Sequence, residues 1–277
     1  MIADCHVHML FDGYDWKAAM QRHAQAPEEG FIRNALQTYQ SLGVTYLRDG
    51  GDRWGVGARA RDLAPEYGIT YRTPLAPLCL QGHYGAFIGL TYANLKEYAD
   101  LVRQQRQQGA DFIKVMVSGI MDFHQWGVLT EPGLAPDLIC QLVHIAHEEG
   151  MALMAHANGA DTILATAAAG ADSIEHGAYQ NAESLAALAE MGTVWVPTLS
   201  TVGNLLGKGR FPETQVAKIL EDFQTQLAGY RGLVAPGTDA GAWAVPHGST
   251  TEAGWLHTAG ITDARLAEGT AAIINKF

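Results

Sequence analysis

The stretch Asp4-Cys5-His6-Val7-His8 holds two histidines that are separated by one residue and follow a short apolar start. In a β-strand, alternate side chains point to the same face. His6 and His8 therefore share one face of a predicted strand, where their imidazoles could bind one metal ion. A catalytic zinc ion usually takes three protein ligands and keeps one open position, so the pair predicts further ligands elsewhere in the chain.

Four other residues with metal-binding or amine chemistry lie inside, or at the ends of, later predicted strands. They are Lys114, His156, His176 and Asp239. The C-terminal ends of the strands form the active-site face of an α/β barrel. In such a barrel these side chains would join His6 and His8 at one mouth. Four imidazoles, one carboxylate and one amine make a site for one or two divalent ions.

Lys114 is the unusual member of this set because it lies inside the apolar run Phe112-Ile113-Lys114-Val115-Met116. A free ammonium there would be disfavoured by burial and by the charge of neighbouring metal ions. Reaction of its amine with carbon dioxide would give a carbamate, an anion whose two oxygens could bridge two metals. The alternative is a lysine that pairs with a carboxylate at the barrel rim.

Short apolar or β-branched runs alternate with helix-period stretches along the chain, which predicts parallel βαβ units. The predicted strands are 2–8, 44–48, 69–73, 111–117, 151–156, 172–176, 193–197 and 233–239. The main predicted helices are 31–42, 56–66, 92–108, 136–149, 160–169, 182–191, 212–228 and 262–275. Eight such strands predict an α/β fold of the (β/α)8 TIM barrel type, with a single domain over residues 1–277. A doubly wound open sheet is the alternative, but no glycine-rich phosphate loop follows the first strand.

The composition favours a small-molecule substrate. The 277 residues carry a formal net charge of -11, which argues against nucleic acid or an anionic membrane as the partner. No apolar run approaches the ~20 residues that cross a bilayer, and the start of the chain does not resemble a signal peptide. We expect a cytoplasmic protein. A homo-oligomer is compatible with these features. The three cysteines, Cys5, Cys79 and Cys140, are predicted to be buried free thiols rather than disulfides.

Taken in order, these motifs resemble the amidohydrolase superfamily. The resemblance is closest to its binuclear metal-dependent branch, which contains prolidase-like dipeptidases and imidazolonepropionase-related hydrolases, and it extends from Asp4 to about Ala272. The motifs are His-Val-His after the first strand, Lys114 in the fourth, His156 in Ala-His-Ala-Asn-Gly, His176 in Ser-Ile-Glu-His-Gly and Asp239 in Gly-Thr-Asp-Ala-Gly. The family usually carries a β-sandwich built from segments before the first strand and after the last helix. Here we expect a compact form that lacks it.

The resemblance implies two divalent metal ions, with zinc as the expected metal. One ion would be held by His6, His8 and Asp239. The second would be held by His156 and His176, and N-carboxylated Lys114 would bridge the two. A hydroxide between the ions would be the nucleophile, and Asp239 would carry its proton to the leaving amine.

The implied reaction is hydrolysis of an amide C–N bond in a dipeptide, an N-acyl amino acid or a cyclic amide. The same centre could serve a lactonase, an esterase or a phosphotriesterase-like hydrolase. A mononuclear deaminase is less favoured, because Lys114 is present and the stretch Ala157-Asn158-Gly159-Ala160 offers no glutamate. A non-catalytic metal-binding barrel is disfavoured because all six candidate ligands are retained.

Substrate contacts are expected in the loops that follow the strands. The candidates are His83, Tyr84, Tyr179 and His247. Aromatic residues near these loops predict an apolar-walled pocket, namely Phe11, Tyr14, Trp16, Tyr84, Phe87, Phe123, Trp126 and Trp243. Basic side chains in these loops, among them Arg22 and Arg210, are too scattered to define a carboxylate site. Arg48 and Arg53 are other candidates, and Arg48 could instead brace the barrel.

Overall fold

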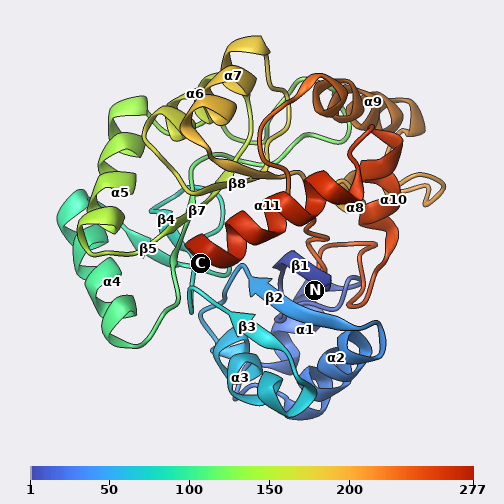
Figure 1. Ribbon diagram of the computed structural model, residues 1–277. Helices are drawn as coiled ribbons and strands as arrows, with labels where there is room; N and C mark the ends of the chain where they lie inside the picture. The colour runs from blue at the N-terminus through green and yellow to red at the C-terminus, as the bar shows by residue number, and fades with distance from the viewer. Residues whose placement is uncertain (1) are drawn as a thin grey trace.

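Parallel strands surround the centre of the molecule, and helices cover them from outside (Figure 1). The computed structural model describes residues 2–277. One sheet has the order β1-β2-β3, and the other has the order β5-β4-β6-β7-β8-β9. The strands are β1 (Ile2–Val7), β2 (Val44–Asp49), β3 (Thr70–Arg72), β4 (Leu78–Leu80), β5 (Leu90–Tyr92), β6 (Ile113–Met116), β7 (Leu153–Ala157), β8 (Ser173–His176) and β9 (Val194–Val196).

Helices follow most of the strands, as the alternating sequence pattern predicts. They are α1 (Trp16–Arg22), α2 (Glu29–Ser41), α3 (Val56–Leu63), the 3-10 helix η1 (Ala64–Tyr67), α4 (Leu95–Gln107), α5 (Pro136–Glu148), α6 (Ala160–Ala168), α7 (Ala182–Met191), α8 (Ser200–Gly203), α9 (Glu213–Gly229), α10 (Thr251–Thr258) and α11 (Asp263–Lys276). Within residues 2–277, no helix combines the length and the apolar composition that a bilayer crossing needs.

Hydrogen bonds join the two sheets on both sides, so that the strands form a barrel. On one side, the segment 233–240 lies between β9 and β1, where Ala235 N donates to Trp195 O at 3.0 Å and Cys5 N donates to Pro236 O at 2.9 Å. On the other side, β3 pairs with β2 while β4 pairs with β6. Asp111 N donates to Thr73 O at 3.0 Å beside this junction. The third barrel strand is therefore split into β3 and β4.

The predicted fold is confirmed, with two differences in its strands. The predicted eighth strand, 233–239, is not a regular strand: one isolated bridge lies at Val234 and another at Ala240, one residue beyond its predicted end. Pro236 has no N–H to donate, and Asp239 has a left-handed φ of 56°, so a regular ladder cannot continue there. The segment between the predicted strand 69–73 and the predicted helix 92–108 contains β4, and β5 ends at Tyr92, where the sequence predicted that a helix begins. Helices α1, α8 and α10 were not predicted.

The interior of the barrel holds a buried ion pair among apolar side chains. Arg48 and Glu175 are both fully buried, and Nη2 of Arg48 lies 2.8 Å from Oε1 of Glu175. The other guanidinium donors of Arg48 bind Cys5 O at 2.7 Å and Ser173 Oγ at 2.9 Å. Phe277, which follows α11, stacks against the guanidinium at 4.4 Å from the ring centroid. Arg48 therefore braces the barrel from inside, and α11 covers the end where it lies (Figure 1).

The cysteines are free, as expected, but not all of them are buried. Cys5 and Cys79 are buried, whereas Cys140 is exposed, which corrects the prediction for that residue. Cys140 lies on α5, whose buried face is formed by Ile139, Leu142, Val143 and Ala146. The prediction for Cys140 was wrong because its apolar sequence neighbours face the core, whereas Cys140 lies on the other face of the same helix.

Candidate metal centre and cavity

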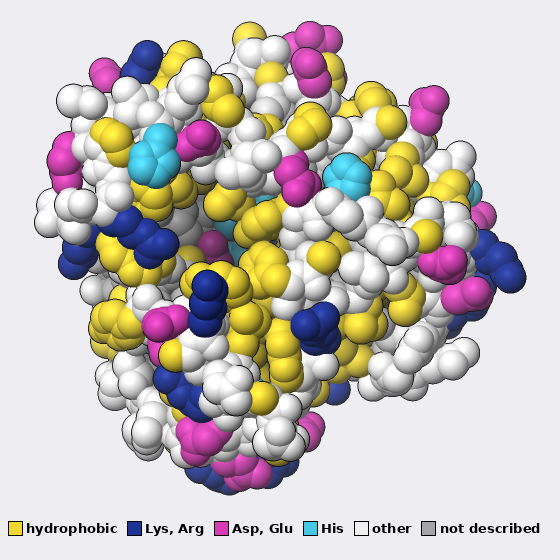
Figure 2. All heavy atoms as spheres, turned by 180° about the vertical axis from the view of Figure 1, so that it is seen from behind, with side chains coloured by type: hydrophobic (Ala, Val, Ile, Leu, Met, Phe, Trp, Pro, Cys, Tyr) yellow, Lys and Arg dark blue, Asp and Glu magenta, His cyan; other side chains and the backbone are white. Residues whose placement is uncertain are grey.

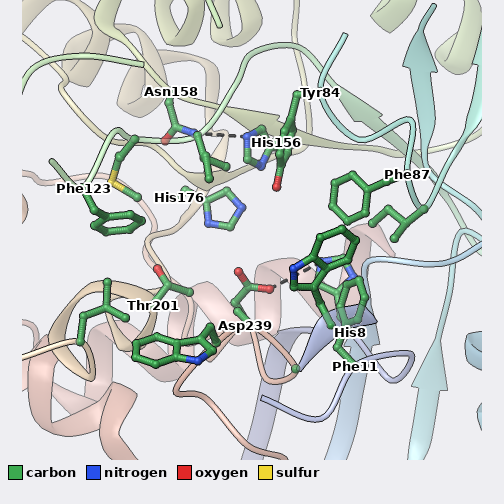
Figure 3. Close-up of a pocket in the computed structure, with 18 of the residues that line it drawn as sticks. His8, Phe11, Tyr84, Phe87, Phe123, His156, Asn158, His176, Thr201 and Asp239 are labelled. Carbon is green, nitrogen blue, oxygen red and sulfur yellow. Dashed lines mark hydrogen bonds and ion pairs between the residues drawn. The ribbon is translucent and has the colours of Figure 1, made fainter. Parts of the chain in front are cut away.

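The six predicted ligands gather at the C-terminal end of the barrel, where a cavity of about 560 Å³ opens to solvent. All of them except His6 line this cavity. Figure 2 shows the opening as a hollow that contains acidic and histidine side chains and has apolar side chains around it. Figure 3 shows His8, His156, His176 and Asp239 turned toward the same space. The strand order therefore brings together residues that are up to 233 positions apart in the chain.

His6, His8 and Asp239 form a compact group of three potential ligands. Nε2 of His6 lies 3.4 Å from Nε2 of His8, and each of these nitrogens lies 3.5 Å from Oδ1 of Asp239. The ligands of a tetrahedral zinc ion with bonds of about 2.0–2.1 Å stand about 3.3–3.5 Å apart. The three side chains thus fit one ion of this size without rearrangement.

Neighbouring residues hold this group in place. Nδ1 of His6 lies 2.7 Å from Oε2 of Glu175, which leaves Nε2 directed at the group. Gly50 leaves room for His8, because a Cβ at that position would lie 2.2 Å from its ring. The backbone N–H of Asp239 donates to His6 O at 2.7 Å, and its left-handed φ turns the carboxylate to the cavity.

His156 and His176 form a second histidine pair beside the first group. Their ring centroids are 4.6 Å apart, and those of His6 and His176 are 5.2 Å apart. Nδ1 of His176 lies 2.7 Å from Oγ1 of Thr198, so its Nε2 stays available. Nε2 of His156 lies 3.2 Å from Gly119 O and 3.3 Å from Nδ2 of Asn158, which leaves Nδ1. Each ring therefore keeps one nitrogen for a further ligand.

Burial makes all four histidines suitable as metal ligands. It lowers the pKa of His8 and of His156 to about 3, and lowers the pKa of His6 and His176 well below the usual value. The positive charge of Lys114 acts in the same direction on each of them. The rings are therefore neutral near pH 7 and offer nitrogen lone pairs.

Lys114 lies in β6 at the floor of the cavity, and its Nζ has no hydrogen-bond partner among the described atoms. Burial lowers the pKa of this amine and raises the pKa of Asp239, while the opposite charges of the two groups oppose both shifts. A buried amine without an acceptor is costly, so this position calls for an anionic partner.

The predicted substrate contacts separate into one residue on the cavity wall and three outside it. Tyr84 lines the cavity and lies over His156, with ring centroids 4.9 Å apart. His83 points to Glu131 at 3.6 Å, and Tyr179 packs against Trp126. Both ring nitrogens of His247 are occupied, by Tyr39 Oη at 3.1 Å and Phe11 O at 2.9 Å. The geometry assigns His247 a structural role.

The apolar-walled pocket predicted from the sequence is present. All of the predicted aromatic residues except Trp126 line the cavity, and Phe211 joins them. Of the four arginines considered, only Arg210 lies on the cavity wall. Arg22 pairs with Asp12 at 2.9 Å, and Arg53 lies over the ring of Trp54 at 4.7 Å.

Three residues that support the candidate ligands were not predicted, namely Glu175, Asn158 and Thr198. One sequence signal pointed to Glu175, because Ser173 and Glu175 alternate on one face of a strand and both are polar in a barrel interior. Neither Asn158 nor Thr198 shows such a pattern. Asn158 contacts His156, two residues before it, and Thr198 contacts His176. Both supporting residues lie just beyond a strand, where strand alternation does not fix the direction of a side chain.

Comparisons with known proteins find relatives of a large part of the chain. The sequence is 28% identical to ochratoxinase of Aspergillus niger over 187 residues, which are 64% of this chain and 36% of that protein. It is 32% identical to an uncharacterized protein of Mycobacterium tuberculosis over 176 residues, which are 62% of this chain and 44% of that protein. The chain thus spans less than half of the length of these two curated relatives.

The solved structures that are similar in fold include a dipeptidase and an ochratoxinase. A Xaa-Pro dipeptidase with bound methionine superposes with a TM-score of 0.76 at 23% identity, over 99% of this chain and 75% of that one. Ochratoxinase of Aspergillus niger gives a TM-score of 0.75 at 20% identity, over 98% and 70% of the two chains. The sequence model of the amidohydrolase family matches residues 2–215, which include five of the six candidate ligands. On this match, and with the candidate ligands at the mouth of an α/β barrel, the chain belongs to the amidohydrolase family.

Proposed function

We propose that this protein is a binuclear metal-dependent hydrolase that cleaves an amide C–N bond in a small substrate, such as a dipeptide, an N-acyl amino acid or a cyclic amide. The observation that carries the proposal is the meeting of His6, His8 and Asp239 beside the unpartnered amine of Lys114. The names of two similar proteins, a Xaa-Pro dipeptidase and an ochratoxinase, support amide hydrolysis. The single-domain organisation, the cytoplasmic location and a homo-oligomeric state stay predictions.

The residues divide between two divalent ions, for which zinc is the first candidate. His6, His8 and Asp239 would hold one ion, and His156 and His176 the other. Lys114, as its N-carboxylate, would supply one oxygen to each. When bound, the ions would lower the pKa of a water molecule to about 7 and polarise the scissile carbonyl.

The other steps belong to side chains of this chain. Asp239 would take the proton of the attacking water at its carboxylate and deliver it to the leaving nitrogen. Glu175 would keep His6 in the tautomer that has its lone pair on Nε2, and Thr198 would orient His176. Tyr84 and Phe87 would shield the reacting bond from bulk water on one side.

Ester, lactone and phosphotriester hydrolysis use the same chemistry and are alternatives on the same centre. No feature of the cavity favours them over an amide. A mononuclear deaminase or a non-catalytic barrel would leave the buried amine of Lys114 without a role.

The test is the metal content of the purified protein, measured by elemental analysis for wild type, Lys114→Ala and the control Lys208→Ala. Lys208 is exposed in the loop between α8 and α9. We expect about two ions per chain in wild type and the control, with loss of metal and of hydrolysis of an N-acyl amino acid panel in Lys114→Ala. A metal content that Lys114→Ala leaves unchanged would contradict the bridging role. Metal-loaded wild type that cleaves no amide would contradict the reaction.

A further inference from the structure

Among the described residues of the cavity wall, Arg210 is the one charged residue that the proposed metal centre does not use. The charged residues that line the cavity are Lys114, Asp239 and Arg210. The first two belong to the proposed ligand set. Arg210 is exposed and makes no ion pair with another described residue, although the chain has an excess of acidic groups.

Aromatic side chains hold the guanidinium of Arg210 in place. It lies 4.5 Å from the ring centroid of Trp243 and 5.4 Å from that of Phe211. Phe211 is in turn packed against Phe123, with centroids 5.1 Å apart. A guanidinium that stacks by its face keeps the N–H groups at its edge free, in the fork that matches a carboxylate.

Among the described residues that line the opposite side of the cavity, none is a cation, although Nζ of Lys17 lies 5.4 Å from the ring centroid of Trp16. There Phe87 packs with Phe11, Trp16 and Tyr84 at centroid distances of 6.4, 5.7 and 5.9 Å. Figure 3 shows Phe87 and Phe11 on one side of Asp239, and Phe123 and Thr201 on the other. The candidate metal ligands thus lie between an aromatic wall and the cluster that carries Arg210.

We infer that Arg210 binds the carboxylate of the substrate, and that the substrate is an N-acyl amino acid whose acyl group is aromatic. The acyl group would contact the wall around Phe87, the amide would lie over the metal ligands, and the amino acid carboxylate would reach Arg210. This inference rests on the proposed function for the position of the scissile bond. It deepens that function, because it specifies the charge and the orientation of the substrate.

The test compares N-benzoyl-L-alanine with N-benzoyl-L-alaninamide, by release of benzoate from the metal-loaded enzyme. Replacement of Arg210 by methionine should raise KM for the carboxylate substrate about tenfold to hundredfold, since hydrogen bonds to charged groups contribute that much. The amide should be hydrolysed equally by wild type and Arg210→Met. The control is Arg53→Met, which removes another arginine stacked on a tryptophan, outside the cavity.

A binding measurement separates this inference from the proposed function. Calorimetric titration of the metal-free protein with N-benzoyl-L-alanine should report binding without turnover. If binding needs Arg210 but no benzoate is released, the carboxylate site stands and the proposed reaction fails. If both compounds bind and react equally in wild type and Arg210→Met, the inference about Arg210 is overturned. Arg210→Lys, which keeps the charge but not the fork, should recover only part of the affinity.

Discussion

Oε2 of Glu175 lies 2.7 Å from Nδ1 of His6, and both side chains are fully buried below the candidate metal group. The other oxygen of the same carboxylate binds Arg48 at 2.8 Å. The Arg48–Glu175 ion pair in the barrel interior therefore contacts His6, the first predicted ligand. A substitution in this pair should alter the metal site, although neither Glu175 nor Arg48 lines the cavity.

Glu175→Gln should weaken metal binding about tenfold to hundredfold, as the loss of a carboxylate behind a histidine ligand typically does. A neutral amide is a poorer acceptor for the His6 N–H and cannot balance the charge of Arg48. Competition with a chelator measures this affinity. Glu183→Gln, an exposed change in the first turn of α7, should leave the affinity at the wild-type value. Equal affinities in both variants would refute the role of Glu175.

Arg48→Met should destabilise the fold more than it changes the site. It leaves the carboxylate of Glu175 buried without its charged partner, which typically costs about 3–5 kcal/mol. Urea unfolding of the metal-loaded protein gives this difference. Arg103→Met, which breaks an exposed pair with Asp100 on α4, should change the free energy of unfolding little. If the two variants were equally stable, the buried pair would not brace the barrel.

The candidate ligands could be predicted because local patterns determine most of them. His6 lies in β1 and His8 just beyond it, and the two rings share a face although the register between β1 and β2 shifts between Asp4 and Val7. Lys114 stands out by its charge in an apolar strand. His176 is different, because in a regular strand it would face away from Glu175. Its left-handed φ of 65° at the end of β8 turns it to the cavity, and sequence periodicity does not reveal that turn.

The substrate contacts were harder to predict because they depend on packing between distant loops. His247 looked available from its position after the last strand, yet it bonds to Tyr39, which lies 208 residues away. Arg210 looked isolated, yet Trp243 and Phe211 hold it at the cavity wall. The apolar character of the cavity could be predicted from residue types. The position of Arg210 on the cavity wall could not, because it depends on the tertiary structure.

Gly50→Ala should reduce metal affinity by displacing His8. A Cβ at Gly50 would lie 2.2 Å from Cε1 and 2.7 Å from Nε2 of that ring, so the imidazole would have to move. Gly254→Ala is the matched control, since no heavy atom lies within 4 Å of its added Cβ on α10. There the change should stabilise the protein by up to about 1 kcal/mol and leave the metal in place. Metal titration of both variants measures their metal affinities. Wild-type affinity in Gly50→Ala would show that His8 is not a ligand.

Glu252 should make stability depend on pH. Its carboxylate accepts hydrogen bonds from Leu199 N and Ser200 N, at 3.0 and 2.7 Å, at the start of α8, but burial raises its pKa to about 8. The folded state therefore keeps a proton that the unfolded state releases near pH 4.5. The stability from this group is complete below pH 4.5 and is lost as the pH rises through about 8.

Glu252→Gln removes this titration, so its free energy of unfolding should fall less than that of wild type between pH 5 and about pH 8. The hydroxyl oxygen of the protonated carboxyl group can still accept the second backbone hydrogen bond, whereas an amide NH2 cannot, so the variant should be less stable at low pH. The slopes, rather than the absolute values, are therefore compared by urea unfolding at fixed free metal. Asp4 and Asp49, whose pKa values burial raises to about 6 and about 7, act in the same direction and remain in both proteins. The difference between the two slopes isolates Glu252, and parallel curves would mean that this carboxyl is already ionised in the folded protein.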